Sequence, residues 1–310
     1  MKDQYLRKID YARIGITDSC NLRCHYCMDE KVKEINQLSR EQLNTIVDVL
    51  DKLEFRKLKF TGGEPLLNND IASVVAYAND KENIRDIGLT TNGVLLDRYL
   101  DELVDAGLKR INISLDSLDK DKFCKITKSN YLDRVLANII SARKRNLIVK
   151  VNVVLMKGIN DDEINDFLEF GRNSNVQIRF IELMPIGQNG DFFNGKQLNT
   201  IELFKNYQKR PKKPNCKDVS DYFIDQYGYV FGIISPLSNH FCETCNRIRF
   251  TSDGKLRLCL HSDNDVDISP YLNDKDQLLN VILTSINDKP DMHHLNNNAI
   301  SHRAMNQIGG

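Results

Sequence analysis

The sequence has no excess of charge of either sign and no long apolar run. Its 43 basic and 43 acidic residues cancel, so no overall electrostatic attraction for nucleic acid or a membrane surface is expected. No apolar stretch approaches the ~20 residues that a helix needs to cross a bilayer. The first residues, Met-Lys-Asp-Gln-Tyr-Leu-Arg-Lys, lack the apolar segment of a signal peptide. Eight cysteines without such a segment predict a cytoplasmic protein with reduced, metal-binding thiols.

Three cysteines stand close together near the N-terminus: Cys20, Cys24 and Cys27, in the spacing Cys-x3-Cys-x2-Cys. Three thiolates in this order can hold three corners of a cubane iron–sulfur cluster. A closed cluster takes four cysteines, and the next one in the chain is Cys124. One iron is therefore predicted to be open to a cofactor, and the run resembles the signature of radical S-adenosylmethionine (SAM) enzymes. Structural zinc, the main alternative, favours paired cysteines, and His25 is poorly placed to complete a zinc site.

Short apolar runs alternate with helical periodicity through the first two thirds of the chain. The clearest helix, Ser39–Leu53, begins with Ser39 and Gln42 in capping-box register. Further helices are expected at Ile71–Ala78, Leu95–Ala106, Leu132–Lys144 and Asp162–Arg172. Strands are expected at Ala12–Thr17, Lys57–Phe60, Asp86–Thr91, Arg110–Leu115, Val149–Met156 and Gln177–Met184. Alternating strands and helices predict an α/β fold, a partial TIM-like barrel of parallel βα units.

The chemically informative segments follow these strands directly. They are Asp18 to Met28, Thr61 to Pro65, Thr90 to Gly93, Ser114 to Ser117, and Met184. Because active sites of such barrels lie at the carboxyl ends of the strands, we expect one shared site. The basic, proline-containing segment 208–215 is interpreted as a solvated linker or loop. At 310 residues the chain is long enough for a barrel (1–208) and a smaller C-terminal domain (209–310).

A second cysteine set, Cys242, Cys245 and Cys259, again has three members. Zinc is a stronger competitor here, because His240 or His261 could complete a Cys3His site. Beside these cysteines, Arg247 and Arg249 occupy alternate positions of an expected strand, so both guanidiniums can face one ligand. Such a pair suits phosphate, which planar forks meet bidentately. A second open cluster beside a phosphate clamp predicts a substrate site, and exposed strand arginines are the alternative.

With both cysteine sets, the chain resembles the GTP 3′,8-cyclase family over nearly its full length. The other segments that carry the resemblance are Thr61-Gly-Gly-Glu-Pro-Leu-Leu, Thr90-Thr-Asn-Gly, Asn112-Ile-Ser-Leu-Asp-Ser-Leu, Val151-Asn-Val-Val-Leu-Met-Lys-Gly-Ile-Asn, Arg179-Phe-Ile-Glu-Leu-Met-Pro-Ile-Gly and Met305-Asn-Gln-Ile-Gly-Gly310. Gly-Gly-Glu-Pro alone indicates only a radical SAM protein. The Cys-x2-Cys-Asn-Arg-x-Arg block with the terminal Gly-Gly is far more selective.

The resemblance implies two 4Fe-4S clusters and SAM as cofactors. The first cluster would be held by Cys20, Cys24 and Cys27, and the second by Cys242, Cys245 and Cys259. The implied SAM contacts are Tyr26, Gly62, Gly63, Glu64, Ser114 and Met184. The implied GTP contacts are Arg13, Lys59, Thr90, Lys150, Arg247, Ile248, Arg249, Gly309 and Gly310. Lys59 stands where the family pattern has arginine, which keeps the charge but not the bidentate fork.

The resemblance also implies a reaction. A 5′-deoxyadenosyl radical takes the ribose 3′ hydrogen of GTP, and the carbon radical closes a ring on C8 of guanine. Arg247 and Arg249 join the first three cysteines as the implied catalytic residues. A homodimer, an electron donor and a downstream cyclic pyranopterin monophosphate synthase are the implied partners. No specific role is expected for Cys124, Cys216, His293 or His294.

Two rival functions remain at this stage. One is a radical SAM enzyme that modifies a peptide through an auxiliary-cluster domain, although such domains usually carry more cysteines. The other is a non-enzymatic iron–sulfur carrier or zinc module. A carrier would favour fully ligated clusters and would not need Gly-Gly-Glu-Pro. Formation of 5′-deoxyadenosine that depends on GTP separates these possibilities.

Overall fold

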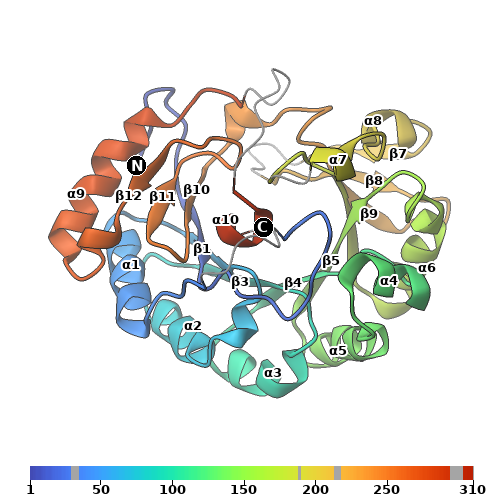
Figure 1. The fold of residues 1–310 in the computed structure, drawn as a ribbon, viewed down its shortest axis with the longest axis horizontal. Coiled ribbons are helices and arrows are strands. Elements are labelled where there is room, and N and C mark those ends of the chain that lie inside the picture. The colour runs from blue at the N-terminus through green and yellow to red at the C-terminus, as the bar shows by residue number, and fades with distance from the viewer. Residues whose placement is uncertain (29–34, 188–189, 213–217, 294–302, 310) are drawn as a thin grey trace.

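A computed structural model describes residues 1–28, 35–187, 190–212, 218–293 and 303–309. Within them, the strands form one curved, twelve-stranded sheet (Figure 1). The strands are β1 (Tyr11–Gly15), β2 (Lys57–Thr61), β3 (Asp86–Thr91), β4 (Arg110–Ser114), β5 (Ile148–Leu155), β6 (Gln177–Glu182), β7 (Gln208–Arg210), β8 (Asp221–Ile224), β9 (Val230–Ile234), β10 (Arg247–Phe250), β11 (Lys255–Arg257) and β12 (Asp265–Asp267).

Strands β1 to β6 follow one another in parallel, as successive βα units require. The C-terminal third of the chain extends both edges of this sheet. Strand β10 pairs parallel with β1, and β9 pairs parallel with β6. Antiparallel neighbours β11 and β12 lie beyond β10, whereas β8 and β7 lie beyond β9. Since β12 and β7 are not paired with each other within the described residues, the barrel is partial, as predicted.

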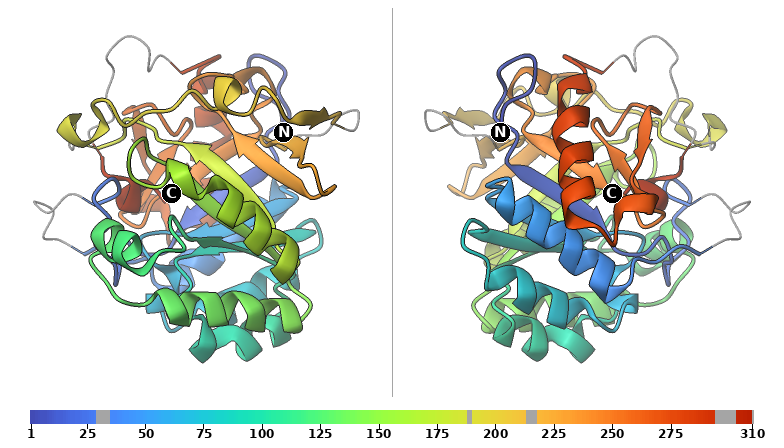
Figure 2. Two further views of the ribbon diagram at one scale, coloured as in Figure 1. Left: turned by 90° about the vertical axis from the view of Figure 1, so that its right-hand side faces the viewer. Right: turned by 90° about the vertical axis from the view of Figure 1, so that its left-hand side faces the viewer.

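Helices cover the outside of the curved sheet, and the C-terminal α10 lies near its centre in the view of Figure 1. Helix α9 packs beside α1 (Figure 2). The helices are α1 (Arg40–Lys52), α2 (Ile71–Asn79), α3 (Leu96–Asp105), α4 (Lys120–Thr127), α5 (Leu132–Lys144), α6 (Ile164–Ser174), α7 (Gly190–Phe193), α8 (Thr200–Leu203), α9 (Lys275–Ser285) and α10 (Met305–Ile308).

The apolar core lies between the sheet and these helices. In α1, the buried residues are Leu43, Ile46, Val47, Val49 and Leu50, which form one face at helical spacing. The expected capping box is present, because Ser39 accepts from Gln42 N and Gln42 caps Ser39 in return. Within the described part of the chain, no helix combines the length and the apolar character that membrane crossing requires.

The six strands and five helices expected from the sequence are present with shifts of a few residues at their ends. The interpretation of 208–215 as linker or loop was wrong at its start. Gln208–Arg210 forms β7 and pairs with β8, and Lys209 forms an ion pair with Asp221 across the two strands, at 2.9 Å. Residues 213–217, including Cys216, lie outside the described residues. Helices α4 and α9 were not expected.

Candidate active site

A pocket of about 550 Å³ opens at the carboxyl ends of the parallel strands. Both cysteine triads line it, so two sets that stand more than two hundred positions apart in the sequence share one cavity. The other predicted residues that line it are Arg13, Tyr26, Lys59, Gly62, Gly63, Thr90, Ser114, Lys150, Met184, Arg247 and Arg249. The shared site expected from the strand ends is therefore present.

The first cysteine loop follows β1, and hydrogen bonds fix its backbone. The carboxylate of Asp18 accepts from the backbone N and from Nδ2 of Asn36, both at 2.9 Å. The sulfur of Cys20 accepts from Leu22 N at 3.4 Å and from Asn92 Nδ2 at 3.7 Å. Such contacts orient a sulfur ligand before metal binds.

Burial governs the ionisation of these three thiols. It raises the pKa of Cys20 to about 11, with the charge of Glu64 as the next cause. Burial and then the neighbouring thiols raise the pKa of Cys24 and Cys27 well above the usual value. Three thiols in this environment need a positive centre in order to be thiolates together. The donor set therefore fits an iron–sulfur cluster.

Two glycines after β2 bring a second loop directly against the cysteine loop. A Cβ atom at Gly62 would lie 2.2 Å from the Thr17 carbonyl oxygen, and one at Gly63 would lie 2.2 Å from that of Ser19. With no side chains in the way, Gly63 N donates to Thr17 O, and Glu64 N donates to Ser19 O, each at 2.7 Å. The close approach requires glycine at both positions.

Glu64 supports this region from behind and does not line the pocket. Its buried carboxylate accepts from Thr91 Oγ1 and Asn92 N at 2.7 Å and from Leu66 N at 3.0 Å. Burial raises its pKa to about 7. Glu64 thus joins the loops after β2 and β3, and so it sets the position of Asn92 beside Cys20.

Tyr26, Ser114 and Met184 also line the pocket, and Tyr26 stands between Cys24 and Cys27 in the first cysteine loop. The hydroxyl of Tyr26 donates to Asp116 Oδ2 at 2.6 Å, and Val154 N donates to Asp116 Oδ1 at 2.8 Å. Burial raises the pKa of Asp116 to about 6. Asp116 therefore fixes the tyrosine ring between the first triad and the strand ends.

The second triad is built around a 3-10 turn, Cys242–Thr244, and Cys259 after β11. Arg7, paired with Asp3 at 2.6 Å, donates to the carbonyl of Cys242 at 3.0 Å. Lys289 is only 2% exposed and donates to the carbonyl of Leu258. The N-terminal segment and the stretch after α9 thus clamp the two halves of the triad together.

Cations surround the second triad, unlike the first. Burial would raise the pKa of Cys245, but the charges of Lys289 and Arg247 outweigh it and hold the pKa below its usual value. Burial raises the pKa of Cys242, although the backbone N–H of His293 opposes the shift. A triad with positive charges beside it suits an anionic cluster of iron and thiolates, so this donor set also fits.

A row of cations crosses the inner face of the sheet. Arg249, Arg13 and Lys59 occupy the same level on β10, β1 and β2, and Arg110 lies one strand beyond Gly88. A Cβ atom at Gly88 would lie 3.2 Å from the Cε atom of Lys59 and 3.3 Å from the Cγ atom of Arg110. Glycine at this position therefore leaves room for two basic side chains in the cavity.

Burial lowers the pKa of Arg13, Arg179 and Arg249 and lowers that of Lys59 strongly. For Lys59 and Arg249 the next cause is a neighbouring arginine. Burial and then Arg179 lower the pKa of Lys150 to about 8. Cations that repel one another in a buried space favour an anion with several charges, since the anion restores their charged forms.

The C-terminal segment reaches this row. The guanidinium of Arg249 donates to the carbonyl of Gly309. Ile308 is buried, and Met305 lines the pocket. Ile248 is buried with its side chain on the other face of β10 from Arg247 and Arg249. Gly310 lies outside the described residues.

Several pocket residues were not expected from the sequence, namely Tyr11, Lys57, Asn92, Arg110, Asn152, Arg179, Lys289 and His293. Arg179 donates to Asn152 Oδ1 at 2.6 Å. Strand alternation was the missed signal, because Arg179 shares a face of β6 with Ile181, which also lines the pocket. His293, for which no specific role was expected, lines the pocket and contacts His240. His294 lies outside the described residues.

Comparison with known proteins agrees with this architecture. Residues 14–171 match the Radical SAM superfamily, and residues 176–295 match the Molybdenum Cofactor Synthesis C family. The chain is 42% identical to the GTP 3′,8-cyclase of Clostridium acetobutylicum, with 100% of both chains covered. It is 39% identical to that of Listeria monocytogenes, with 100% of this chain and 99% of the relative covered.

Among solved structures, the fold resembles Streptococcus suis SuiB bound to S-adenosylmethionine. The TM-score is 0.68 at 15% identity, and the match covers 89% of this chain and 66% of SuiB. At this identity the likeness shows only the fold. A partial barrel with an added C-terminal part is therefore common to both proteins.

Proposed function

Because this chain belongs to the GTP 3′,8-cyclase family of the radical SAM superfamily, we propose that it converts GTP to (8S)-3′,8-cyclo-7,8-dihydroguanosine 5′-triphosphate. This is the first step of molybdenum cofactor biosynthesis. One observation carries the proposal: two three-cysteine sets and a buried row of cations line the same pocket. Radical chemistry alone needs one such set. The second set and the cations add a site for a polyanionic substrate.

We assign the first cluster to Cys20, Cys24 and Cys27. When bound there, the cluster and SAM supply a 5′-deoxyadenosyl radical that takes the ribose 3′ hydrogen of GTP. The side chains of this chain hold SAM in place. Tyr26, Ser114 and Met184 form the wall beside the triad, and Asp116 keeps the Tyr26 ring oriented. The SAM contacts that we propose are Tyr26, Gly62, Gly63, Ser114 and Met184. Glu64, which the resemblance also implied, lies behind them and supports the loops.

We assign the second cluster to Cys242, Cys245 and Cys259, with the guanine base of GTP at its open iron. The neighbouring cations then neutralise the triphosphate and fix the nucleotide between the triads, where pre-alignment lowers the barrier. The proposed GTP contacts are Arg13, Lys59, Thr90, Lys150, Arg247, Arg249, Gly309 and Gly310. Arg179 joins them, because its guanidinium is buried in the same cavity. Ile248, which the resemblance also implied, is excluded because its side chain lies on the other face of β10.

The remaining assignments rest on family membership. We propose a cytoplasmic homodimer that takes electrons from a reductant protein and passes its product to cyclic pyranopterin monophosphate synthase. We also propose a division of labour between residues 1–208, which hold SAM, and 209–310, which hold the second cluster. The second part continues the same sheet on both edges, which supports a shared cavity at their junction.

Anaerobic reconstitution followed by turnover with SAM, dithionite and GTP tests the function. We expect 5′-deoxyadenosine formation to depend on GTP and the cyclic nucleotide to accumulate. Cys242→Ser should still cleave SAM, but without dependence on GTP, and should form no cyclic nucleotide, because the nucleotide loses its anchor. Normal cyclisation by that variant would contradict the role of the second triad.

A further inference from the structure

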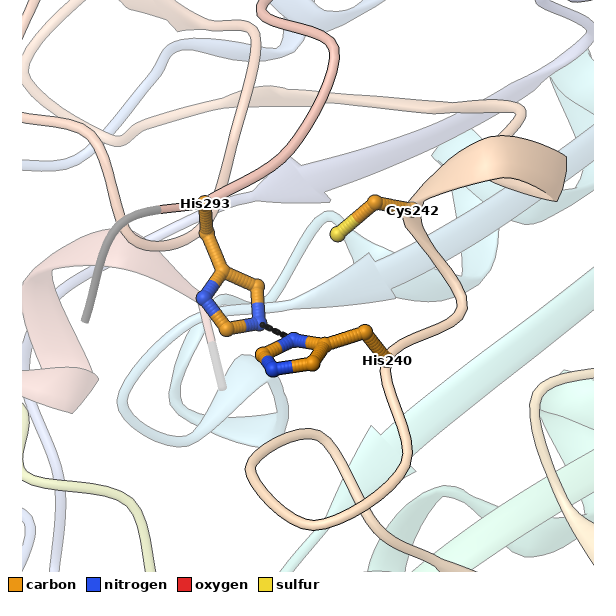
Figure 3. A group of neighbouring side chains, drawn as sticks. All are labelled: His240, Cys242 and His293. Atoms are coloured by element: carbon orange, nitrogen blue, oxygen red, sulfur yellow. Dashed lines mark hydrogen bonds between the residues drawn. The ribbon is translucent and has the colours of Figure 1, made fainter. Parts of the chain in front are cut away.

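Three imidazoles gather beside the second triad. The rings of His240 and His293 have centroids 4.4 Å apart, and those of His261 and His293 lie 4.5 Å apart. His240 Nδ1 and His293 Nε2 are within hydrogen-bond distance at 2.8 Å. Figure 3 shows both rings beside the sulfur of Cys242. Histidine is a common metal ligand, so this cluster needs a chemical explanation.

The ligand atoms of His240, Cys242 and His293 all lie within 4.8 Å of one another. A single metal ion bound by these three residues would take Cys242 away from the second triad. The triad already fits an iron–sulfur cluster and is one ligand short. An imidazole that joins the triad uses the same residues without this conflict.

His293 combines two features that suit a cluster ligand. It lines the pocket, as His261 does, whereas His240 is exposed and does not. Its ligand nitrogen and the sulfur of Cys242 also lie within 4.8 Å of each other. It comes from the stretch after α9, which Arg7 holds by donating to the carbonyls of Pro290 at 2.6 Å and Asp291 at 2.9 Å. His293 thus lies beside the triad on a fixed support.

We propose that His293 is a displaceable fourth ligand of the second cluster, which binds the open iron until GTP takes its place. The inference rests on the proposed function, because it concerns the same cluster. Imidazole replaces cysteine at the iron of some clusters. Either ring nitrogen can bind a metal, since the proton is then carried by the other one.

A displaceable ligand has a thermodynamic consequence. GTP must compete with the imidazole, so the apparent affinity for GTP is lower than the intrinsic affinity of the open iron. Removing the imidazole should therefore tighten GTP binding. A merely structural role for His293 predicts the opposite, because loss of packing beside Cys242 would weaken the site.

The test uses the full chain with Cys20, Cys24 and Cys27 all replaced by serine, so that only the second cluster contributes to the spectrum. The protein is labelled with ¹⁵N-histidine, reconstituted anaerobically, reduced with dithionite and examined by pulsed electron paramagnetic resonance. We expect a ¹⁵N coupling from histidine without GTP and its loss when GTP is added. The coupling should disappear in His293→Ala and His293→Gln and persist in His240→Ala and His261→Ala.

Binding of GTP to the same proteins gives the second readout. We expect His293→Ala and His293→Gln to bind GTP at least about fivefold more tightly, the lower end of typical coupling. Absence of the histidine coupling from the GTP-free cluster, or its persistence in both His293 variants, would overturn the proposal. Loss of cluster iron in both variants would also do so, because three cysteines should hold a cluster without a displaceable ligand. If the parent variant holds no second cluster or binds no GTP, the proposed function itself fails, and the inference fails with it.

Discussion

The guanidinium of Arg249 donates to the carbonyl oxygen of Gly309, so a strand beside the second triad holds the C-terminal segment. Three residues earlier, the same segment contacts the first triad. The backbone N–H of Asn306 donates to the carbonyl oxygen of Cys27 at 3.5 Å, and Asn306 Nδ2 donates to Asp18 O at 2.9 Å. One short segment therefore connects the loop of the first triad to the strand beside the second triad.

Gly309→Ala should disturb this connection. Gly309 has φ = 71°, and a Cβ atom there would lie 2.8 Å from Thr61 Cγ2. The backbone penalty alone is about 1–2 kcal/mol, and the clash adds to it. We expect the rate of GTP cyclisation to fall by about tenfold or more, measured in single-turnover assays.

Gly228→Ala is the matched control. Gly228 also has a positive φ, 80°, but nothing lies within 4 Å of a Cβ atom placed there. It should show the backbone penalty as a small loss of thermal stability with unchanged activity. Equal activity of the two variants would show that the C-terminal segment does not act at the site.

Lys59→Met should weaken GTP binding. Lys59 is 5% exposed, and no carboxylate forms an ion pair with it within the part of the chain that the structure describes. A hydrogen bond to a charged group is typically worth ~1.5–3 kcal/mol, so the Kd for GTP should rise about 10- to 100-fold. Equilibrium binding of GTP without SAM measures the change.

Lys57→Met supplies the comparison on the same strand face. Lys57 lines the pocket but forms an ion pair with Asp86 at 3.2 Å and is more exposed. Its charge is already compensated and partly screened, so its loss should change the Kd much less. A larger effect at Lys57 than at Lys59 would contradict the proposed position of the triphosphate.

The sequence was sufficient to predict the barrel strands and two cysteine triads that line one pocket. Alternating strands and helices gave the parallel sheet, and the cysteine spacing identified both triads. Lys150 and Thr90 were named from the family resemblance, and Lys150 lies near the start of β5, away from its carboxyl end. The strand, helix and cysteine patterns lie within short segments, so they can be recognised in a single sequence without knowledge of contacts between distant residues.

The missed features depend on contacts between distant segments. Nothing near Lys289 or Arg7 in the sequence shows that they clamp the second triad, because both act across the fold. Gly88 is an unremarkable strand residue until its neighbours on β2 and β4 are known. His293 was dismissed for a similar reason, since its polar surroundings in the sequence hide its contact with Cys242.

The titration of Lys150 predicts how GTP binding depends on pH. Burial and then the charge of Arg179 lower its pKa to about 8 in the substrate-free protein, while Asp218, 3.7 Å away, favours the charged form. Lys57 and Arg110 also oppose the charge. The ammonium is therefore present below about pH 8 and lost above it, so GTP affinity should fall as the pH rises through 8. Binding of GTP measured from about pH 6.5 to about pH 9.5 should show that, above the pKa of Lys150, binding is coupled to the uptake of one proton.

Lys150→Arg separates this cause from others. An arginine stays protonated over the whole range, so the step near pH 8 should vanish while affinity at low pH is retained. Asp218→Asn should move the step to lower pH, because removing the carboxylate further disfavours the ammonium. A step that survives unchanged in Lys150→Arg would assign the titration to another group.

Lys289→Met should make the second cluster harder to reduce. Lys289 is nearly inaccessible to solvent. Burial raises the pKa of Cys245, but the positive charges of Lys289 and Arg247 outweigh this effect and lower the pKa. The charge of Lys289 favours the more negative, reduced cluster. Removing a unit charge from a partly buried site costs about 1–2 kcal/mol, on the order of 50–90 mV for one electron.

Redox titration of the variant lacking the first three cysteines should show the potential falling by this amount, whereas Lys289→Arg should keep it near that of the parent. If both substitutions leave the potential unchanged, the lysine serves only to hold the Leu258 carbonyl and the loop of Cys259.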